Sequence, residues 1–161
     1  MTLAYDGTSF SGWQRQRGFP TIQGAVEACL ERITGERPNL EGSGRTDAGV
    51  HALGQVANFR TGSALPAPVL LRAANALLPP SIRILNLDPA PFPFHARRAA
   101  RQKRYAYRFV RSRHAPPFGR EYALHVKYPL DLERMRQAGR LLVGRRDFAA
   151  LATNPGEERR S

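Results

Sequence analysis

The chain has 161 residues, of which 42% are hydrophobic, so it can bury the core of at least one domain and is not a disordered tail. Its 25 Lys and Arg residues outnumber its 13 Asp and Glu residues, and the formal net charge of +12 predicts a polyanionic partner. No apolar run approaches the ~20 residues of a membrane-spanning helix, and no signal-peptide pattern opens the chain. We therefore expect a cytoplasmic protein with no membrane partner.

In chain order, a short strand is predicted at residues 3–5, and turn residues follow it at 6–8. Thr21 is a typical N-cap for the helix predicted after it, and Gly35 is a typical residue at which such a helix ends. The apolar residues between these two recur at helical spacing: Ile22, Ala25, Val26, Cys29, Leu30 and Ile33. We expect Cys29, the lone cysteine, to be a core residue.

Residues 40–47 predict a turn that leads into an alternating strand at residues 55–60, so the two together indicate a hairpin with polar residues in its loop. A second helix is predicted at residues 68–78, and one more strand at residues 82–87. The apolar face of that helix is expected to carry Val69, Leu70, Ala73, Ala74 and Leu77. This order of elements predicts an α+β fold of the ferredoxin-like kind, a split β-α-β sandwich with an antiparallel sheet.

The predicted ferredoxin-like unit fills residues 1–92, and proline-rich sequence leads into a linker at residues 93–100. Residues 101–161 then begin a second, similar half, with a strand at 104–110 and a helix at 131–143. These elements are too few to close a second sandwich. We expect this half to be incomplete, either because the chain is a fragment of a longer protein or because its remainder is disordered.

A candidate catalytic carboxylate, Asp47, lies in the predicted hairpin loop between Gly44 and Gly49, two residues after Arg45. Glycine lets a backbone approach a ligand closely, and a loop held by a strand pair is a common place for a catalytic group. An ordinary Asx turn with an exposed carboxylate would account for the same residues.

Metal and cofactor chemistry has little support in the sequence. The four histidines are scattered and there is no cysteine cluster, so no metal site is expected. No phosphate-binding glycine loop of the P-loop or Rossmann kind is present, so no nucleotide cofactor is expected either. We expect His51 to brace the Asp47 loop by hydrogen bonding.

The string SGRTDAGVH at residues 43–51, with GQV at 54–56, resembles the signature loop of the TruA family of tRNA pseudouridine synthases. Further matches follow the order of the family: residues 5–7, 12–16, 21–23, 94–97, 104–107 and 144–148. The resemblance covers essentially the whole chain.

By this resemblance Asp47 is the catalytic nucleophile, which attacks the target uridine at the sugar C1′ or at the base C6. Arg45 is then its ion-pair and positioning partner. Tyr105 matches the active-site tyrosine of the family, which stacks on the flipped base and is a candidate for proton transfer. Because Tyr105 and Tyr107 share one face of the predicted strand, both could instead be core residues, and for Tyr107 this is the expected role.

Basic residues beside Tyr105 are expected to follow an RNA backbone: Arg97, Arg98, Arg101, Lys103 and Arg104. Arg15 and Arg17, beside Trp13, are further candidates of the same kind. A solvated, charged linker is the alternative interpretation of the segment 97–104.

The resemblance implies an isomerase that converts uridine to pseudouridine in the anticodon stem-loop of tRNA, at nucleotides 38–40, and that works as a homodimer without a cofactor. The later half of the family's chains supplies a basic partner for the aspartate and further strands. We therefore expect these 161 residues alone to be inactive or barely active. A non-catalytic RNA-binding fragment is the alternative, and a nucleoside hydrolase with the same carboxylate is a third hypothesis.

Overall fold

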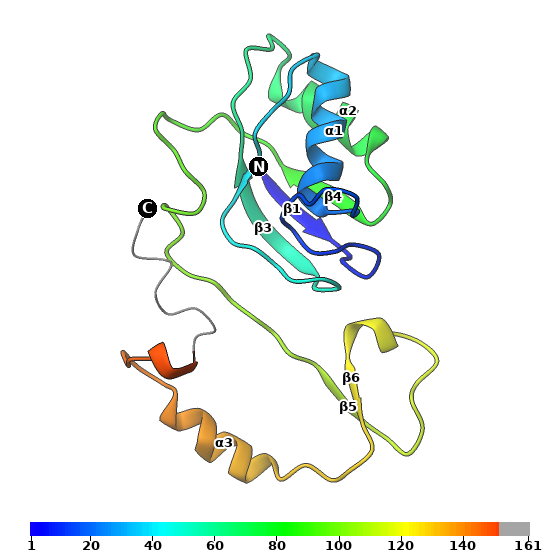
Figure 1. Ribbon diagram of the computed structural model, residues 1–161, viewed down its shortest axis with the longest axis vertical. Coiled ribbons are helices and arrows are strands. Elements are labelled where there is room, and N and C mark those ends of the chain that lie inside the picture. The colour runs from blue at the N-terminus through cyan, green and yellow to red at the C-terminus, as the bar shows by residue number, and fades with distance from the viewer. Residues whose placement is uncertain (152–161) are drawn as a thin grey trace. The chain divides into compact units, whose positions relative to one another are not determined.

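The computed structural model describes residues 1–151 (Figure 1). The chain divides into two compact units, Met1–Tyr105 and the residues from Ala106 onward. This division falls after the predicted linker at 93–100, and the predicted domain boundaries stay predictions. The last part of the predicted second half, residues 152–161, lies outside the described residues.

The first unit contains a four-stranded antiparallel sheet in the order β2-β3-β1-β4. Its elements, in chain order, are β1 (Thr2–Tyr5), α1 (Ile22–Thr34), β2 (Glu41–Gly42), β3 (Ala52–Asn58), α2 (Ala67–Leu77) and β4 (Ile82–Asn86). In β1, Leu3 and Tyr5 are buried while Thr2 and Ala4 are only half-buried, as the two-residue period of a strand requires. The predicted α+β class with an antiparallel sheet is confirmed.

Helix α1 begins and ends where its capping residues predict. The Thr21 hydroxyl oxygen accepts a hydrogen bond from the Gly24 N–H, and Gly35 takes the left-handed φ of 72° while its N–H donates to the Glu31 carbonyl oxygen. The apolar face of the helix closes the core over the sheet, and its fully buried side chains are Ile22, Val26 and Leu30. Cys29 is buried and free, so its predicted core position is confirmed.

Helix α2 buries a narrower face than its sequence predicts. Leu70 and Ala74 are buried, but Val69 and Leu77 are exposed, so their assignment to the core face was wrong. The buried residues continue to Leu78, one position past the helix. Residues spaced by four lie along one line of a helix, and this line is the buried part of α2. Leu71, beside it, packs against the core while only partly buried.

Strand β3 lies earlier in the sequence than the predicted strand at 55–60. It begins at Ala52, which pairs with Tyr5 of β1, and it ends at Asn58, which pairs with Glu41 of β2. The predicted hairpin is confirmed, but Phe59 and Arg60 lie beyond its last pair. Cross-strand pairing, which the alternation of residues does not reveal, sets these bounds.

The second unit contains a two-stranded parallel sheet of β5 (Phe109–Arg111) and β6 (Leu124–Val126). A short 3-10 helix η1 (Arg120–Tyr122) precedes β6, and α3 (Leu132–Leu141) and a 3-10 helix η2 (Ala149–Leu151) follow it. The helix predicted at residues 131–143 is confirmed as α3, and Asp131 caps it by accepting a hydrogen bond from the Arg134 N–H.

The predicted strand at residues 104–110 is wrong for most of its length. Only its last two residues belong to β5, and residues 101–108 form no regular element. No strand among residues 1–151 pairs with them, and a strand needs a neighbour for its backbone groups. Tyr107 is accordingly 77% exposed and is not the core residue that was expected.

Within residues 1–151, no helix is long and apolar enough to cross a membrane.

Candidate active site

Asp47 lies in the loop of residues 43–51 that joins the edge strand β2 to β3. The Val50 N–H donates to the Asp47 carbonyl oxygen at 3.2 Å, and Gly49 has a left-handed φ of 77°, which closes a turn. The Asp47 side chain is exposed, and no residue of the described part of the chain holds its carboxylate by a hydrogen bond or an ion pair. The carboxylate is therefore accessible to a ligand.

Two backbone hydrogen bonds fix this loop to the segment that follows β1. The Trp13 N–H donates to the Thr46 carbonyl oxygen at 2.9 Å, and the Gly49 N–H donates to the Phe10 carbonyl oxygen at 3.2 Å. The two bonds hold the backbone immediately before Asp47 and two residues after it. The backbone that carries Asp47 therefore loses little freedom when the carboxylate meets a substrate.

The same segment approaches the loop so closely that only glycine fits at two positions. A Cβ atom on Gly7 would lie 2.1 Å from the Val50 carbonyl oxygen, and a Cβ atom on Gly12 would lie 2.5 Å from the Thr46 carbonyl oxygen. Gly12 also has a φ of 91°, which side-chain-bearing residues rarely adopt. The backbone of residues 7–12 thus forms one wall of the Asp47 loop.

A buried tyrosine supports the loop from the sheet. The Tyr5 hydroxyl lies 2.9 Å from Oγ1 of Thr46, and the Tyr5 side chain is almost fully buried beside Trp13, with ring centroids 6.1 Å apart. Burial raises the pKa of the Tyr5 phenol, and the hydrogen bond with Thr46 opposes that rise in part. The phenol is therefore neutral near pH 7.

The base of the loop is held by Gln55 of β3. Its Nε2 group donates to the Gly44 carbonyl oxygen, and its Oε1 lies 3.3 Å from the Ser43 hydroxyl. The Ser43 N–H donates to the Val56 carbonyl oxygen at 2.8 Å. One amide side chain therefore fixes the backbone on the β2 side of the loop.

His51 holds the β3 side of the loop against the segment that follows β1. Its Nδ1 lies 3.2 Å from the Gly7 nitrogen, which donates a hydrogen bond to it, and 3.1 Å from Oδ1 of Asp6. The expected hydrogen bonding of His51 at the loop is confirmed.

Arg45 and Asp47 lie in the same loop, and both side chains are exposed. The structure does not join them by an ion pair within the described residues.

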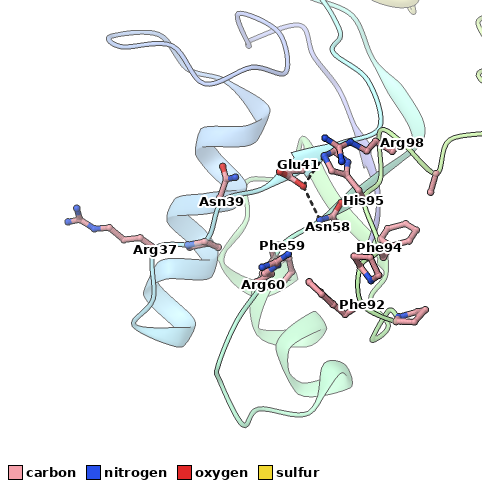
Figure 2. A pocket seen from close by; sticks show the side chains of 14 residues that line it. Arg37, Asn39, Glu41, Asn58, Phe59, Arg60, Phe92, Phe94, His95 and Arg98 are labelled. Atoms are coloured by element: carbon pink, nitrogen blue, oxygen red, sulfur yellow. Dashed lines mark hydrogen bonds and ion pairs between the residues drawn. The ribbon is translucent and has the colours of Figure 1, made fainter. Parts of the chain in front are cut away.

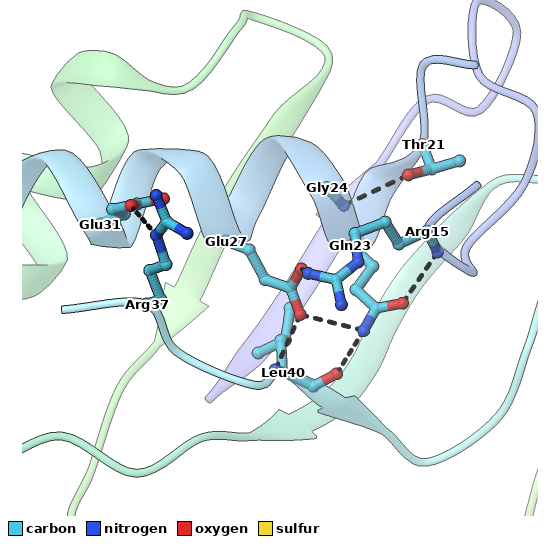
Figure 3. A network of polar contacts seen from close by, with 8 residues as sticks. All are labelled: Arg15, Thr21, Gln23, Gly24, Glu27, Glu31, Arg37 and Leu40. Atoms are coloured by element: carbon cyan, nitrogen blue, oxygen red, sulfur yellow. Dashed lines mark hydrogen bonds and ion pairs between the residues drawn. The ribbon is translucent and has the colours of Figure 1, made fainter. Parts of the chain in front are cut away.

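Arg15 takes part in a polar network at the start of α1 (Figure 3). Its Nη1 donates to Oε2 of the buried Glu27 at 2.8 Å, while its backbone N–H donates to Oε1 of Gln23. Oε1 of Glu27 accepts hydrogen bonds from Gln23 Nε2 and from the Leu40 N–H, each at 3.0 Å. The Arg15 charge is thus compensated within the protein, whereas the exposed Arg17 takes no part in this network.

The predicted RNA-binding residues of segment 97–104 are all exposed: Arg97, Arg98, Arg101, Lys103 and Arg104. Lys103 reaches the Asp47 loop, because its Nζ lies 3.3 Å from the position of a Cβ atom on Gly44. Tyr105 is 78% exposed, and no described contact joins it to Asp47.

No group of three or more His, Cys, Asp or Glu side chains among residues 1–151 is placed to hold a metal ion. Burial raises the pKa of the Cys29 thiol, whose Sγ lies 3.6 Å from the Ala74 carbonyl oxygen. This thiol is a packed core group with no part in the site.

Four supporting residues were assigned no role from the sequence: Tyr5, Gly12, Thr46 and Gln55. Each lies within or beside one of the motifs that resemble the family, and this was the available signal. The roles of Tyr5, Gly12 and Thr46 depend on contacts between segments far apart in the sequence, such as the one between Tyr5 and Thr46 across 41 positions. Gln55 acts across the hairpin, on Ser43 and Gly44.

An exposed carboxylate on a braced loop, with a cationic segment beside it, defines a class of site suited to chemistry on a polyanion. The sequence profile of the family described as tRNA pseudouridine synthase matches residues 1–97. Curated relatives named tRNA pseudouridine synthase A match nearly the whole chain. The one from Caldicellulosiruptor bescii is 43% identical over 98% of this chain, and the one from Lacticaseibacillus casei is 45% identical over 97%.

The chain belongs to the TruA family of tRNA pseudouridine synthases. It spans about 64% of the length of these two relatives, and 62% of the length of a Brevibacillus brevis relative that is 46% identical over 94% of this chain.

Proposed function

We propose that this chain is part of an enzyme that isomerises uridine to pseudouridine in the anticodon stem-loop of tRNA, at nucleotides 38–40. The observation that carries the proposal is the exposed Asp47 carboxylate on a loop that is fixed from three sides. Free access and a fixed backbone are what a catalytic carboxylate needs.

The reaction needs one nucleophile and no redox partner. Asp47 attacks the uridine at C1′ or at C6, the bond between N1 and C1′ breaks, and the base turns so that C5 faces the sugar. A bond then forms between C5 and C1′, the C5 proton leaves, and N1 takes up a proton. Because atoms and electrons balance within one nucleoside, no cofactor is consumed, and a carboxylate can leave again after the transfer.

Two further residues have roles in this proposal. Arg45 pairs with Asp47 and positions it once RNA fills the site, which agrees with its exposed place two residues away in the same loop. Tyr105 stacks on the flipped base and is a candidate for proton transfer. Its high exposure supports a contact with RNA, since a ring that is left in water gains most from stacking.

The basic side chains follow the RNA backbone in this proposal: Arg17, Arg97, Arg98, Arg101, Lys103 and Arg104, with Arg15 in a smaller part because Glu27 compensates its charge. The contact of Lys103 with the loop at Gly44 supports an RNA path that reaches Asp47.

The architecture of the whole enzyme is also a proposal. We infer two ferredoxin-like halves, one at residues 1–92 and one that begins at residue 101, and a cytoplasmic homodimer with tRNA as its partner. The strand order β2-β3-β1-β4 supports the first half. The many exposed apolar residues of the second unit, such as Leu141 and Val143, support a second half that needs more chain, so that residues 1–161 alone are inactive.

The test uses a joined chain, in which residues 1–161 are followed by the part of the Lacticaseibacillus casei relative that lies beyond its match. The joined chain should release tritium from tRNA labelled at C5 of uridine, and a nuclease digest should contain pseudouridine in the anticodon stem-loop. Failure of a folded joined chain, under conditions where the whole relative is active, would contradict the proposal. Free uracil in place of pseudouridine would indicate a nucleoside hydrolase.

An RNA-binding fragment without catalysis is the second candidate, favoured by the lack of any described contact between Tyr105 and Asp47. In that case the 161-residue chain binds tRNA and the joined chain still forms no pseudouridine.

A further inference from the structure

A cavity of about 890 Å³ lies at the end of the β2–β3 hairpin opposite to the Asp47 loop (Figure 2). Three segments line it: residues 37–41 at the start of β2, residues 58–60 at the end of β3, and residues 91–99. All of them belong to the first unit. The volume lies within the range of roughly 300–1,000 Å³ that is typical of small-ligand sites.

The floor of this cavity is held by hydrogen bonds. The Ala96 N–H donates to Oδ1 of Asn58 at 2.6 Å, while Nδ2 of Asn58 donates to Oε2 of Glu41 at 3.3 Å. Nε2 of His95 lies 3.4 Å from the same carboxylate oxygen. The Glu41 carboxylate thus contacts Asn58 and His95, and the hydrogen bond from Ala96 to Asn58 attaches segment 91–99 to the hairpin.

The rim carries cations and an exposed ring. The Arg60 guanidinium lies over the Phe92 ring, 4.8 Å from its centroid, yet Phe92 remains 79% exposed. Arg37 pairs with Glu31, but no carboxylate among residues 1–151 pairs with Arg60 or Arg98. The cavity therefore combines two uncompensated guanidinium groups with an aromatic face in contact with water.

We propose that this cavity binds one unpaired nucleotide of the tRNA, away from the nucleotide that Asp47 attacks. The base stacks on the free face of Phe92, and the guanidinium groups of Arg60 and Arg98 contact the adjoining phosphates. Unpaired bases on aromatic rings with arginine beside them are the usual form of recognition of single-stranded RNA. The inference rests on the proposed function, because the tRNA supplies the ligand.

The charge of the rim decides between this occupant and others. Two free arginines would repel a second copy of a chain whose net charge is +12, whereas they attract a phosphate backbone. The cavity also lacks the glycine-rich loop that free nucleoside triphosphates use, so a nucleotide held within an RNA chain fits better.

The experiment measures the affinity of the 161-residue chain for unmodified tRNA transcript by fluorescence anisotropy. Phe92→Leu should weaken binding roughly tenfold, since it removes one stacking platform. Phe118→Leu, which replaces another highly exposed ring, outside the cavity, should leave the affinity unchanged. Because Phe92 is exposed, thermal unfolding of both variants should match the parent, which separates loss of binding from loss of fold.

The role of Arg98 is tested against a control variant that loses the same charge elsewhere. Arg98→Gln should lower the slope of log affinity against log salt concentration by about one. Arg72→Gln, on the outer face of α2, removes the same charge and should leave the slope unchanged. Irradiation of tRNA that carries 4-thiouridine should cross-link a peptide that contains Phe92.

If the parent binds tRNA but Phe92→Leu and Arg98→Gln behave as their controls do, the cavity is not a nucleotide site while the proposed function stands. If the parent does not bind tRNA at all, the assignment of this cavity fails, while the proposed function is decided separately by the joined chain. A change of oligomeric state in Phe92→Leu, with tRNA affinity unchanged, would show a protein interface and overturn the assignment.

Discussion

The phenolic hydroxyl of Tyr5 lies 2.9 Å from Oγ1 of Thr46, the residue immediately before Asp47. This contact connects the first strand of the sheet with the loop that carries the candidate nucleophile, across 41 positions of sequence. Because Tyr5 is buried in the core, the position of the loop depends on the packing of the sheet.

Tyr5→Phe keeps the buried ring and removes only this hydrogen bond. We expect the free energy of unfolding of the 161-residue chain to fall by about 1 kcal/mol, the usual net value of one hydrogen bond. Urea unfolding followed by circular dichroism measures it. Tyr128→Phe, at a tyrosine that is 78% exposed, should leave the stability unchanged. An equal loss in both variants would show that the Thr46 contact contributes nothing.

The same residue predicts a loss of stability in alkali. Because the pKa of Tyr5 is raised in the folded protein, the folded state binds the phenolic proton more tightly than the unfolded state does. The stabilisation is complete below the unfolded pKa of about 10, and it is lost as the pH rises above that value. The free energy of unfolding, measured with urea between about pH 9 and pH 11, should therefore fall more steeply with pH for the parent than for Tyr5→Phe. Parallel pH profiles would contradict this.

Gly12→Ala tests the close approach of residue 12 to the Asp47 loop, with Gly18→Ala as its control. Both glycines have a positive φ, so both substitutions strain the backbone by about 1–3 kcal/mol. At residue 12 the new Cβ atom would lie 2.5 Å from the Thr46 carbonyl oxygen. At residue 18 no atom lies within 4 Å of the new Cβ atom. We expect Gly12→Ala to cost about 2 kcal/mol more. An equal loss of stability in Gly12→Ala and Gly18→Ala would mean that the Asp47 loop moves away from the new Cβ atom without cost.

Sequence reasoning predicted the local features of the fold well. Helix α1 begins after Thr21 and ends before Gly35, because capping depends on residues that are adjacent in sequence. The predicted strand at 104–110 failed because a strand needs a partner, and none among residues 1–151 pairs with most of it. Alternation of residue types reports which side of a strand is apolar but not whether another strand lies beside it.

In the candidate site, too, the sequence predicted local features but not the contacts between segments. Asp47 was assigned by resemblance of its loop to a family, and the structure places it on an exposed, braced loop. The roles of Thr46 and Gln55 were not foreseen, because Thr46 acts through a contact with Tyr5 of β1 and Gln55 through a contact across the folded hairpin. The expected pairing of Arg45 with Asp47 stays a prediction about the RNA-bound enzyme.

The role of Asp47 as the nucleophile is tested most directly by Asp47→Asn in the joined chain, with tritium release from C5-labelled tRNA as the measurement. Asn keeps the shape of the side chain and removes the attacking carboxylate, so we predict a loss of at least roughly a thousandfold, with tRNA affinity unchanged. Asp88→Asn, at another exposed acidic residue, should keep the activity of the parent. Turnover retained in Asp47→Asn would contradict the account.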